Sequence, residues 1–259
     1  MGSSGSPIYL LIGFSQGVAV GAGVVVSQYL GAKDKKETRI AVHTSLAIAV
    51  ILGLILTVGG IAVSRSLLVW MNTPEEVLGD AVTYMKLYFG GVLFSVVYNM
   101  AAGILNAAGN SRRSVIYLAC ASITNIILDL VLIAGLKMGV AGVAWATFLC
   151  QGISCVLAVA VVIRRLNQLP SQGKPVLFSG DLLGRFVVIA IPSVLQQSFI
   201  SVGNILIQSV INSCGVGVTA GYAAAIKLNN LVTTSFTTLG NGISNYTCLL
   251  YTSDAADDK

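Results

Sequence analysis

A single aspartate inside an apolar segment is the residue of this sequence best suited to chemistry. Asp129 follows Asn125 by four residues, and Ser122 precedes Asn125 by three, so the three side chains share one face of a helix. A carboxylate in such surroundings has to be protonated, paired or bound to a cation. Because oxygen ligands suit a small hard cation or a proton, the spacing predicts a cation site. A neutral carboxylic acid held by one hydrogen bond is the alternative.

Stripes of polar side chains run along three other apolar segments, 82–107, 186–211 and 218–247. The polar residues recur at helical spacings, which keeps them on one face of each helix. Static hydrogen bonding between helices is one explanation. The stripes are longer than that role requires, so we predict a water-filled substrate cavity. Its expected residues are Tyr84, Tyr88, Tyr98, Asn99, Gln197, Asn204, Gln208 and Lys227, the last of which falls off the stripe of its segment.

The other reactive residue types form no enzymatic pattern. His43 is the only histidine, and the five cysteines include no C-x-x-C pair. The sequence contains no phosphate-binding loop, metalloprotease, serine-hydrolase or dinucleotide motif. We therefore expect no enzyme activity, no cofactor, and no metal apart from Na⁺ at Asp129. Two alternatives to a protein that moves a substrate through this cavity are an intramembrane enzyme and a scaffold that transports nothing.

Composition places these residues in a membrane protein. Of the 259 residues, 55% are hydrophobic and 10% are charged, whereas soluble domains carry about 25% charged residues. A helix needs about 20 apolar residues to cross the hydrocarbon core. Seven segments have this length, at 8–30, 40–63, 82–107, 115–136, 140–163, 186–211 and 218–247. The predicted fold class is an all-α polytopic membrane protein.

Basic residues concentrate in alternate connectors. If the seven spans alternate in direction, the first, third and fifth connectors share one side and carry ten of the 15 Lys and Arg residues. The ten are Lys33, Lys35, Lys36, Arg39, Arg112, Arg113, Arg164, Arg165, Lys174 and Arg185. The positive-inside rule predicts that the loops 33–39, 112–113 and 164–185 are cytoplasmic. The net charge of +5 therefore reflects topology, and we expect no nucleic-acid partner.

Small residues, prolines and one long connector indicate packing and boundaries. Gly13, Gly17 and Gly21 form a small-xxx-small stripe, which predicts close helix packing, and Pro192 predicts a kink. We divide the chain into a first bundle at 1–165, a linker at 166–185 and the start of a second bundle at 186–247. Residues 248–259 resemble a translated sequencing adaptor, and we expect this tail to be non-native.

Four parts of the sequence resemble the MATE family (multidrug and toxic compound extrusion). Residues 17–34 resemble its second helix and the loop after it, and 72–77 its outer loop between helices three and four. Residues 107–113 resemble its inner loop before helix five, and 125–147 its fifth and sixth helices. The resemblance implies a twelve-helix fold of two six-helix bundles. This chain would then hold helices two to eight, without the first helix and the last four.

The resemblance also implies a function and a cation site. The family exports cationic or amphipathic drugs in exchange for Na⁺ or H⁺, and we expect a monomer in the inner (plasma) membrane. In one branch, the cation ligands are an Asn and an Asp on helix five and a Thr on helix six, which fall on Asn125, Asp129 and Thr147. That branch also uses an Asp on helix one, which this chain lacks. The alternative is a flippase for lipid-linked oligosaccharides, which would need a more cationic cavity than Lys227 provides.

Overall fold

The computed structural model of the chain is an assembly of long helices. It describes residues 5–70, 75–109, 111–135, 139–167, 180–212 and 216–257. The elements are α1 (Gly5–Gly31), α2 (Lys35–Trp70), α3 (Glu75–Ala107), α4 (Ser111–Leu130), the π-helical turn η1 (Val131–Gly135), α5 (Gly139–Asn167), α6 (Gly180–Asn212) and α7 (Val216–Asp257). No strand occurs in these ranges, which confirms the all-α prediction.

Each predicted span falls on one helix, with one exception. The segment 115–136 is divided between α4 and η1, and its last residue lies outside the described ranges. Each helix extends beyond its apolar segment at one end or at both, because polar residues at a membrane surface continue the helical hydrogen bonding. The segment 248–257, predicted to be a non-native tail, continues α7 as helix. Its origin stays a prediction.

Five of the described helices are long and apolar enough to cross a membrane. The spans are Leu11–Gly31, Lys35–Val69, Ala81–Ala107, Ala141–Asn167 and Gly180–Asn204. In α4 the apolar part, Ala119–Ile133, is shorter than these spans. α7 is not one of the five, because the polar side chains that form its stripe lower its hydropathy. Hydropathy of the described residues thus supports five of the seven predicted spans.

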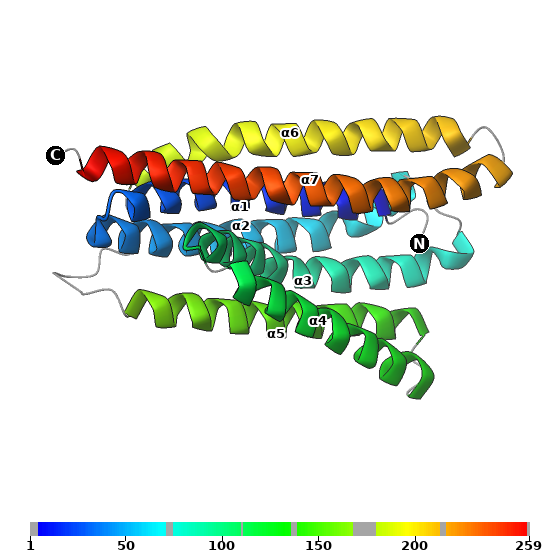
Figure 1. The fold of residues 1–259 in the computed structure, drawn as a ribbon. Helices are drawn as coiled ribbons and strands as arrows, with labels where there is room; N and C mark the ends of the chain where they lie inside the picture. The colour runs from blue at the N-terminus through cyan, green and yellow to red at the C-terminus, as the bar shows by residue number, and fades with distance from the viewer. Residues whose placement is uncertain are drawn as a thin grey trace.

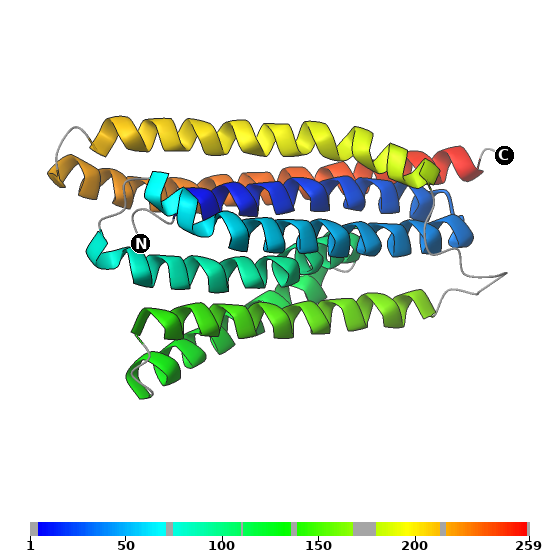
Figure 2. The same ribbon diagram turned by 180° about the vertical axis from the view of Figure 1, so that it is seen from behind.

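α1 occupies the centre of the assembly. Figures 1 and 2 show it between the pair α6–α7 and the pair α2–α3, with α5 beyond α3 and α4 crossing obliquely beside α5. The core that holds these helices together combines small and β-branched side chains with larger ones such as Met and Phe. Its members include Ala22, Val25, Val26, Val92, Val96, Met100 and Ala101, each of them almost fully buried.

The predicted glycine stripe of α1 packs directly against α6. A Cβ atom added at Gly17 would lie 2.8 Å from Val194 Cα, and one added at Gly21 would lie 2.9 Å from Ala190 Cβ. Gly13 lies opposite Ser201 in the same way. The prediction of close packing is therefore confirmed. Pro192 lies inside α6 close to this contact, and the kink predicted there stays a prediction.

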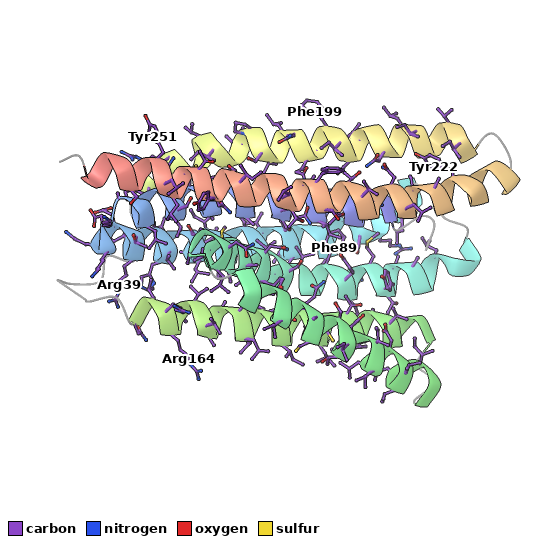
Figure 3. The ribbon with its side chains drawn as sticks, viewed as in Figure 1. Arg39, Phe89, Arg164, Phe199, Tyr222 and Tyr251 are labelled. Carbon is purple, nitrogen blue, oxygen red and sulfur yellow. The ribbon has the colours of Figure 1, made fainter. Side chains whose placement is uncertain are left out.

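The basic connectors lie at one end of the helix assembly. α1, α3, α5 and α7 end there, and α2, α4 and α6 begin there (Figure 1). Figure 3 shows Arg39 of α2 and Arg164 of α5 at this end. Arg185 of α6 lies with its guanidinium 6.0 Å from the ring centroid of Tyr29, which ties α6 to the end of α1. We call this the basic end. Residue 174, also predicted for this side, lies outside the described ranges.

Candidate functional site

Asp129 lies near the end of α4, in the half of the assembly away from the basic end. Its Oδ1 atom is buried and has no hydrogen-bond partner among the described residues. A buried carboxylate oxygen without a partner costs several kcal/mol unless a proton or cation compensates the charge. The helix changes from α to π geometry two residues later, and π-helical turns are frequent at functional sites. The surroundings are those expected of the predicted cation site.

Side chains from three helices converge on Asp129. The carboxylate interacts electrostatically with the Tyr84 hydroxyl of α3 and with the Cys150 thiol of α5. The Asn125 side chain, one turn before Asp129 on α4, also interacts with this thiol. The predicted pair of Asn125 and Asp129 therefore faces α3 and α5. These groups can offer a cation carboxylate, amide and phenol oxygens.

Thr147 lies on the same side of α5 as this cluster, because it precedes Cys150 by three residues. Its hydroxyl donates a hydrogen bond to the Val143 carbonyl oxygen at 3.0 Å, within its own helix. Its oxygen lone pairs can still accept a hydrogen bond or bind a cation. In the described part of the chain, no hydrogen bond joins Thr147 to Asp129. Its role as a third ligand stays a prediction.

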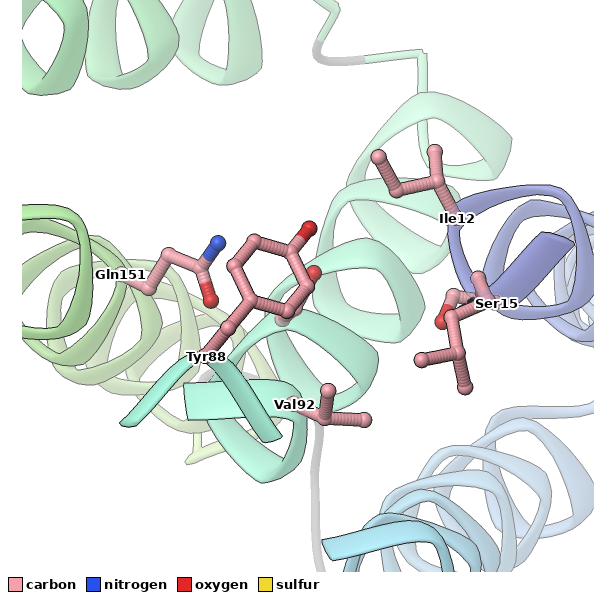
Figure 4. Close-up of a pocket in the computed structure, with 7 residues that line it drawn as sticks. Ile12, Ser15, Tyr88, Val92 and Gln151 are labelled. Carbon is pink, nitrogen blue, oxygen red and sulfur yellow. Dashed lines mark hydrogen bonds between the residues drawn. The ribbon is translucent and has the colours of Figure 1, made fainter. Parts of the chain in front are cut away.

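A cavity lies beside this cluster, between α1, α3 and α5 (Figure 4). Its lining residues are Leu11, Ile12, Ser15, Tyr88, Val92, Ser95 and Gln151. In Figure 4 the Gln151 amide and the Tyr88 ring face Ile12 and Ser15 of α1. The cavity volume is about 10 Å³, which is about the room that one water molecule needs. In the present arrangement of the helices it therefore fits a water or a small cation and not a drug-sized ligand.

Two tyrosines on successive turns of α3 link the cavity to the carboxylate. The rings of Tyr84 and Tyr88 stack with centroids 6.3 Å apart and an interplanar angle of 27°. Tyr84 faces Asp129, whereas Tyr88 lines the cavity. The predicted cation site and the cavity are therefore separated by one turn of helix.

The remaining residues predicted for a substrate cavity lie elsewhere. Asn99 donates a hydrogen bond to the Ser95 carbonyl oxygen of its own helix, at 2.9 Å. Gln197 of α6 donates from Nε2 to Gln16 Oε1 of α1, at 3.4 Å. Tyr98 packs against the core, and Asn204 is exposed on α6. The side chains at 208 and 227 lie outside what the structure describes. Among the described side chains of this prediction, Tyr88 alone lines the cavity.

Three polar residues of this region were not selected from the sequence. Cys150 is only 5% exposed, and its thiol comes close to Asp129 through the packing of α5 against α4, which the sequence does not reveal. Gln151 and Ser15 line the cavity. Gln151 could have been found, since it is an amide within an apolar segment four residues after Thr147.

The five apolar helices, with an aspartate that has one buried oxygen in a sixth, define a polytopic α-helical membrane protein. The family model MatE matches residues 2–131, half of the chain. The chain belongs to the MATE family, as its sequence motifs predicted.

Curated relatives cover almost the whole chain. It is 28% identical over 244 residues to the "Probable multidrug resistance protein YpnP" of Bacillus subtilis, an alignment that covers 93% of this chain and 54% of the relative. It is 23% identical over 223 residues to the "Multidrug export protein MepA" of Staphylococcus saprophyticus, with 86% of this chain and 49% of the relative covered. The chain spans about half the length of these relatives.

Solved structures have the same fold. A MOP superfamily transporter from Pyrococcus furiosus superposes with a TM-score of 0.85 at 24% identity, covering 95% of this chain and 55% of that one. An outward-facing multidrug resistance MATE family transporter superposes with a TM-score of 0.78 at 23% identity, again covering 95% of this chain and 55% of that one. At this level of identity the comparison establishes the fold alone.

Proposed function

We propose that the protein containing this chain exports drugs across the plasma membrane in exchange for Na⁺ or H⁺. Export of drugs is supported by family membership and by the names of the relatives, which are multidrug resistance or export proteins. Coupling to a cation is supported by one observation, the buried Oδ1 atom of Asp129 without a hydrogen-bond partner. An uncompensated carboxylate there favours binding of a positive charge.

The exchange works by alternating access around this carboxylate. With a cation or a proton bound, Asp129 is neutralised and the present packing of α3, α4 and α5 is favoured. When the cation or proton leaves, the carboxylate has to gain water or another partner, which favours a second arrangement of the helices. Coupling arises only if drug affinity differs between the two arrangements. The cytoplasmic side in this proposal is the basic end.

The drug binds between the helices of the two predicted bundles. The described cavity of about 10 Å³ is too small for such a ligand, so the drug site opens only when helices separate. The contact between α1 and α6 is where this separation would occur. It carries polar groups, including the Gln16–Gln197 pair and Ser201, which a cationic drug could contact once the helices part.

A flippase for lipid-linked oligosaccharides receives less support. Such a protein has to hold a pyrophosphate, which requires basic side chains around its binding cavity. The polar lining of the described cavity consists of Ser15, Tyr88, Ser95 and Gln151, all of them neutral. A small cation fits this neutral lining better than a dianion does.

The test is Asp129→Asn in the full open reading frame. The amide keeps the shape of the side chain and removes the charge, so we expect cation-driven efflux from membrane vesicles to fall at least tenfold while membrane abundance stays unchanged. Asp181→Asn is the matched control, because Asp181 is an exposed acid in the first turn of α6. It should transport normally. Normal cation-driven efflux by Asp129→Asn would refute the proposal.

A further inference from the structure

The burial of α7 changes along its length. Its described side chains between residues 228 and 244 are all exposed, and Asn245 is the first half-buried side chain after them. α7 and α1 both end at the basic end, so the two helices run in the same direction (Figure 1). From Asn245 onward, α7 approaches the other helices in the half of the assembly nearer the basic end.

Asn245 packs where α1 meets α3. A Cβ atom added at Gly23 of α1 would lie 3.5 Å from Asn245 Oδ1 and 3.9 Å from Asn245 Nδ2. The Gly103 carbonyl oxygen of α3 would lie 3.5 Å from the same added atom. The two glycines let the helices approach closely, because a Cβ atom at Gly103 would lie 2.7 Å from the Ala19 carbonyl oxygen. We call the contact of Asn245 with Gly23 and its surroundings the Asn245 junction.

The Asn245 junction is near the basic end and is polar. Gly23 lies about 12 Å along the helix from Gly31, the last residue of α1. Nearer that end, the contact of Arg185 with Tyr29 joins α6 to α1, so both helices of the predicted second bundle contact α1 in this half. An amide that leaves such a contact can be hydrated by water, which makes separation less costly than separation of apolar surfaces. The junction is therefore suited to repeated opening.

We propose that the Asn245 junction is a gate, which closes the basic end between α7 and the pair α1–α3. The gate is closed in this structure, and it opens when the Asn245 amide leaves Gly23, so that a drug can enter from the cytoplasm. The inference rests on the proposed function, because it assumes that helices of the two bundles separate during export. It adds a residue that belongs neither to the predicted cation site nor to the predicted substrate cavity.

The first experiment enlarges Gly23 and measures access to a buried serine one helical turn nearer the basic end. Ser27 lies on the same face of α1 as Gly23, is fully buried, and donates a hydrogen bond to the Val24 carbonyl oxygen at 2.9 Å. In the full-length protein without native cysteines, Ser27→Cys is labelled with a membrane-impermeant maleimide in inverted vesicles. Ser64→Cys is the matched control, since Ser64 of α2 is equally buried and donates to the Ile61 carbonyl oxygen at 2.8 Å.

Gly23→Val should raise the labelling rate of Ser27→Cys about tenfold, because overpacking destabilises the closed arrangement and labelling follows the open population. Valine in a helix is largely restricted to one rotamer, so its methyl groups cannot turn away from Asn245. Gly23→Ala should stay within about twofold of the parent, since a Cβ atom 3.5 Å from Asn245 Oδ1 makes an ordinary van der Waals contact. Labelling of Ser64→Cys should not change in either variant.

Adding Asn245→Ala to Gly23→Val shows which helix the valine meets. Loss of the amide makes room for the valine, so labelling of Ser27→Cys should return to within about twofold of the parent. High labelling that persists in this double variant would place the clash at the Gly103 carbonyl oxygen, inside the first bundle, and would overturn the inference. Unchanged labelling in Gly23→Val, or an equal increase at Ser64→Cys, overturns it too.

A reversible cross-link tests the gate without enlarging Gly23 beyond a cysteine, in case Gly23→Val does not fold. Gly23→Cys and Asn245→Cys are combined in the same background and treated with a short bis-methanethiosulfonate reagent. We expect the cross-link to form and to stop drug efflux, and reduction with dithiothreitol to restore efflux in the same vesicles. Parental efflux by the cross-linked protein overturns the inference, and so does the absence of a cross-link between the two positions.

Failure of this inference is distinguishable from failure of the proposed coupling, because labelling of Ser27→Cys requires neither drug nor cation. If Asp129→Asn is inactive while Gly23→Val leaves the labelling unchanged, cation exchange stands and the gate is refuted. If Asp129→Asn transports normally while Gly23→Val exposes position 27 to the maleimide, the proposed coupling is wrong and the gate stands.

Discussion

At the scale of single residues, the charge on Asp129 determines what its neighbours do. The carboxylate has one buried oxygen without a hydrogen bond. A bound cation or proton would replace the favourable interactions with water that this oxygen loses on burial. In the proposed cation site, Asn125 of α4 and Tyr84 of α3 would contribute neutral oxygens. One positive charge would then balance the carboxylate.

The Tyr84 hydroxyl leads to a testable prediction about the binding of a cation or proton at Asp129. In Tyr84→Phe the ring and its stacking on Tyr88 are kept, but the oxygen that interacts with Asp129 is lost. A ligand that binds the folded state raises the melting temperature, and at a given concentration a weaker ligand raises it less. We expect the purified Tyr84→Phe protein to show a smaller rise in melting temperature on adding Na⁺, or on lowering the pH, than the parent protein shows.

Tyr88→Phe is the control for this measurement. Tyr88 stacks on Tyr84 and lines the cavity, so the substitution removes a hydroxyl one turn away from Tyr84. It should keep the parental response to the cation. An equal loss of response in both variants would show that the tyrosine pair acts through packing and that the Tyr84 oxygen is not a ligand.

Of this candidate site, Asn125 and Asp129 were predicted from the sequence, whereas the approach of Cys150 and Tyr84 to Asp129 was not. Asn125 and Asp129 were identifiable because a helix places residues four apart on one face, a local rule that needs no tertiary structure. Cys150 and Tyr84 come to Asp129 from other helices, and the sequence contains no record of which faces of α3 and α5 meet α4. Tyr84 was selected as an aromatic of the substrate cavity, and its position beside the carboxylate was not predicted.

At the scale of the helices, glycines determine how closely neighbours approach. The stripe on α1 was predicted, and it lies against α6. A second contact of this kind, between α2 and α3, was not predicted. There the Leu93 N–H donates a hydrogen bond to Thr57 Oγ1 at 3.2 Å, and Gly60 leaves room for the Phe89 ring. Gly53, Thr57 and Gly60 have the spacing of a small-residue face, so this signal was present in the sequence.

The contact between α1 and α6 gives a prediction about stability. A methyl group at Gly17 would lie 2.8 Å from the Val194 Cα atom, and backbone cannot move aside as a flexible side chain can. Overpacking of this kind costs about 1–3 kcal/mol. We expect Gly17→Ala to lower the melting temperature in detergent by several degrees, as measured by loss of the monodisperse peak after heating.

The matched control for this prediction is Gly203→Ala on α6. A Cβ atom there would meet nothing within 4 Å, so only the helix propensity changes, and alanine is favoured over glycine by up to about 1 kcal/mol. Its melting temperature should equal or exceed that of the parent. A stable Gly17→Ala variant would mean that α1 and α6 are not in close contact in the membrane.

The helical segments were predictable from the sequence, whereas the π-helical turn after α4 and the oblique crossing of α4 were not. Long apolar segments in a membrane protein have to be helical, because backbone groups find no partners in lipid other than those within the helix. The turn to π geometry after Leu130 has no such signal. The oblique crossing of α4 likewise follows from its contacts with α5, which periodicity does not contain.

At the scale of the whole molecule, the two ends of the assembly differ in charge and the sides are apolar. Large hydrophobic side chains are exposed along α6 and α7, including Val188 at 71%, Phe199 at 74% and Phe236 at 70%. Such surfaces are compatible with lipid or with further helices, and not with water. The charge difference between the ends is then the feature that fixes direction across the membrane.

The final prediction concerns this direction, and both of its probes are on one helix. Lys36 and Arg65 are exposed and lie near opposite ends of α2, separated by 29 residues of helix or about 44 Å, more than the hydrocarbon core of about 30 Å. In a background without native cysteines, Arg65→Cys should react with a membrane-impermeant maleimide in intact cells. Lys36→Cys should react only after permeabilisation, because the positive-inside rule keeps the basic end in the cytoplasm. The reverse pattern would invert the proposed orientation, and labelling of both in intact cells would show that α2 does not cross the membrane.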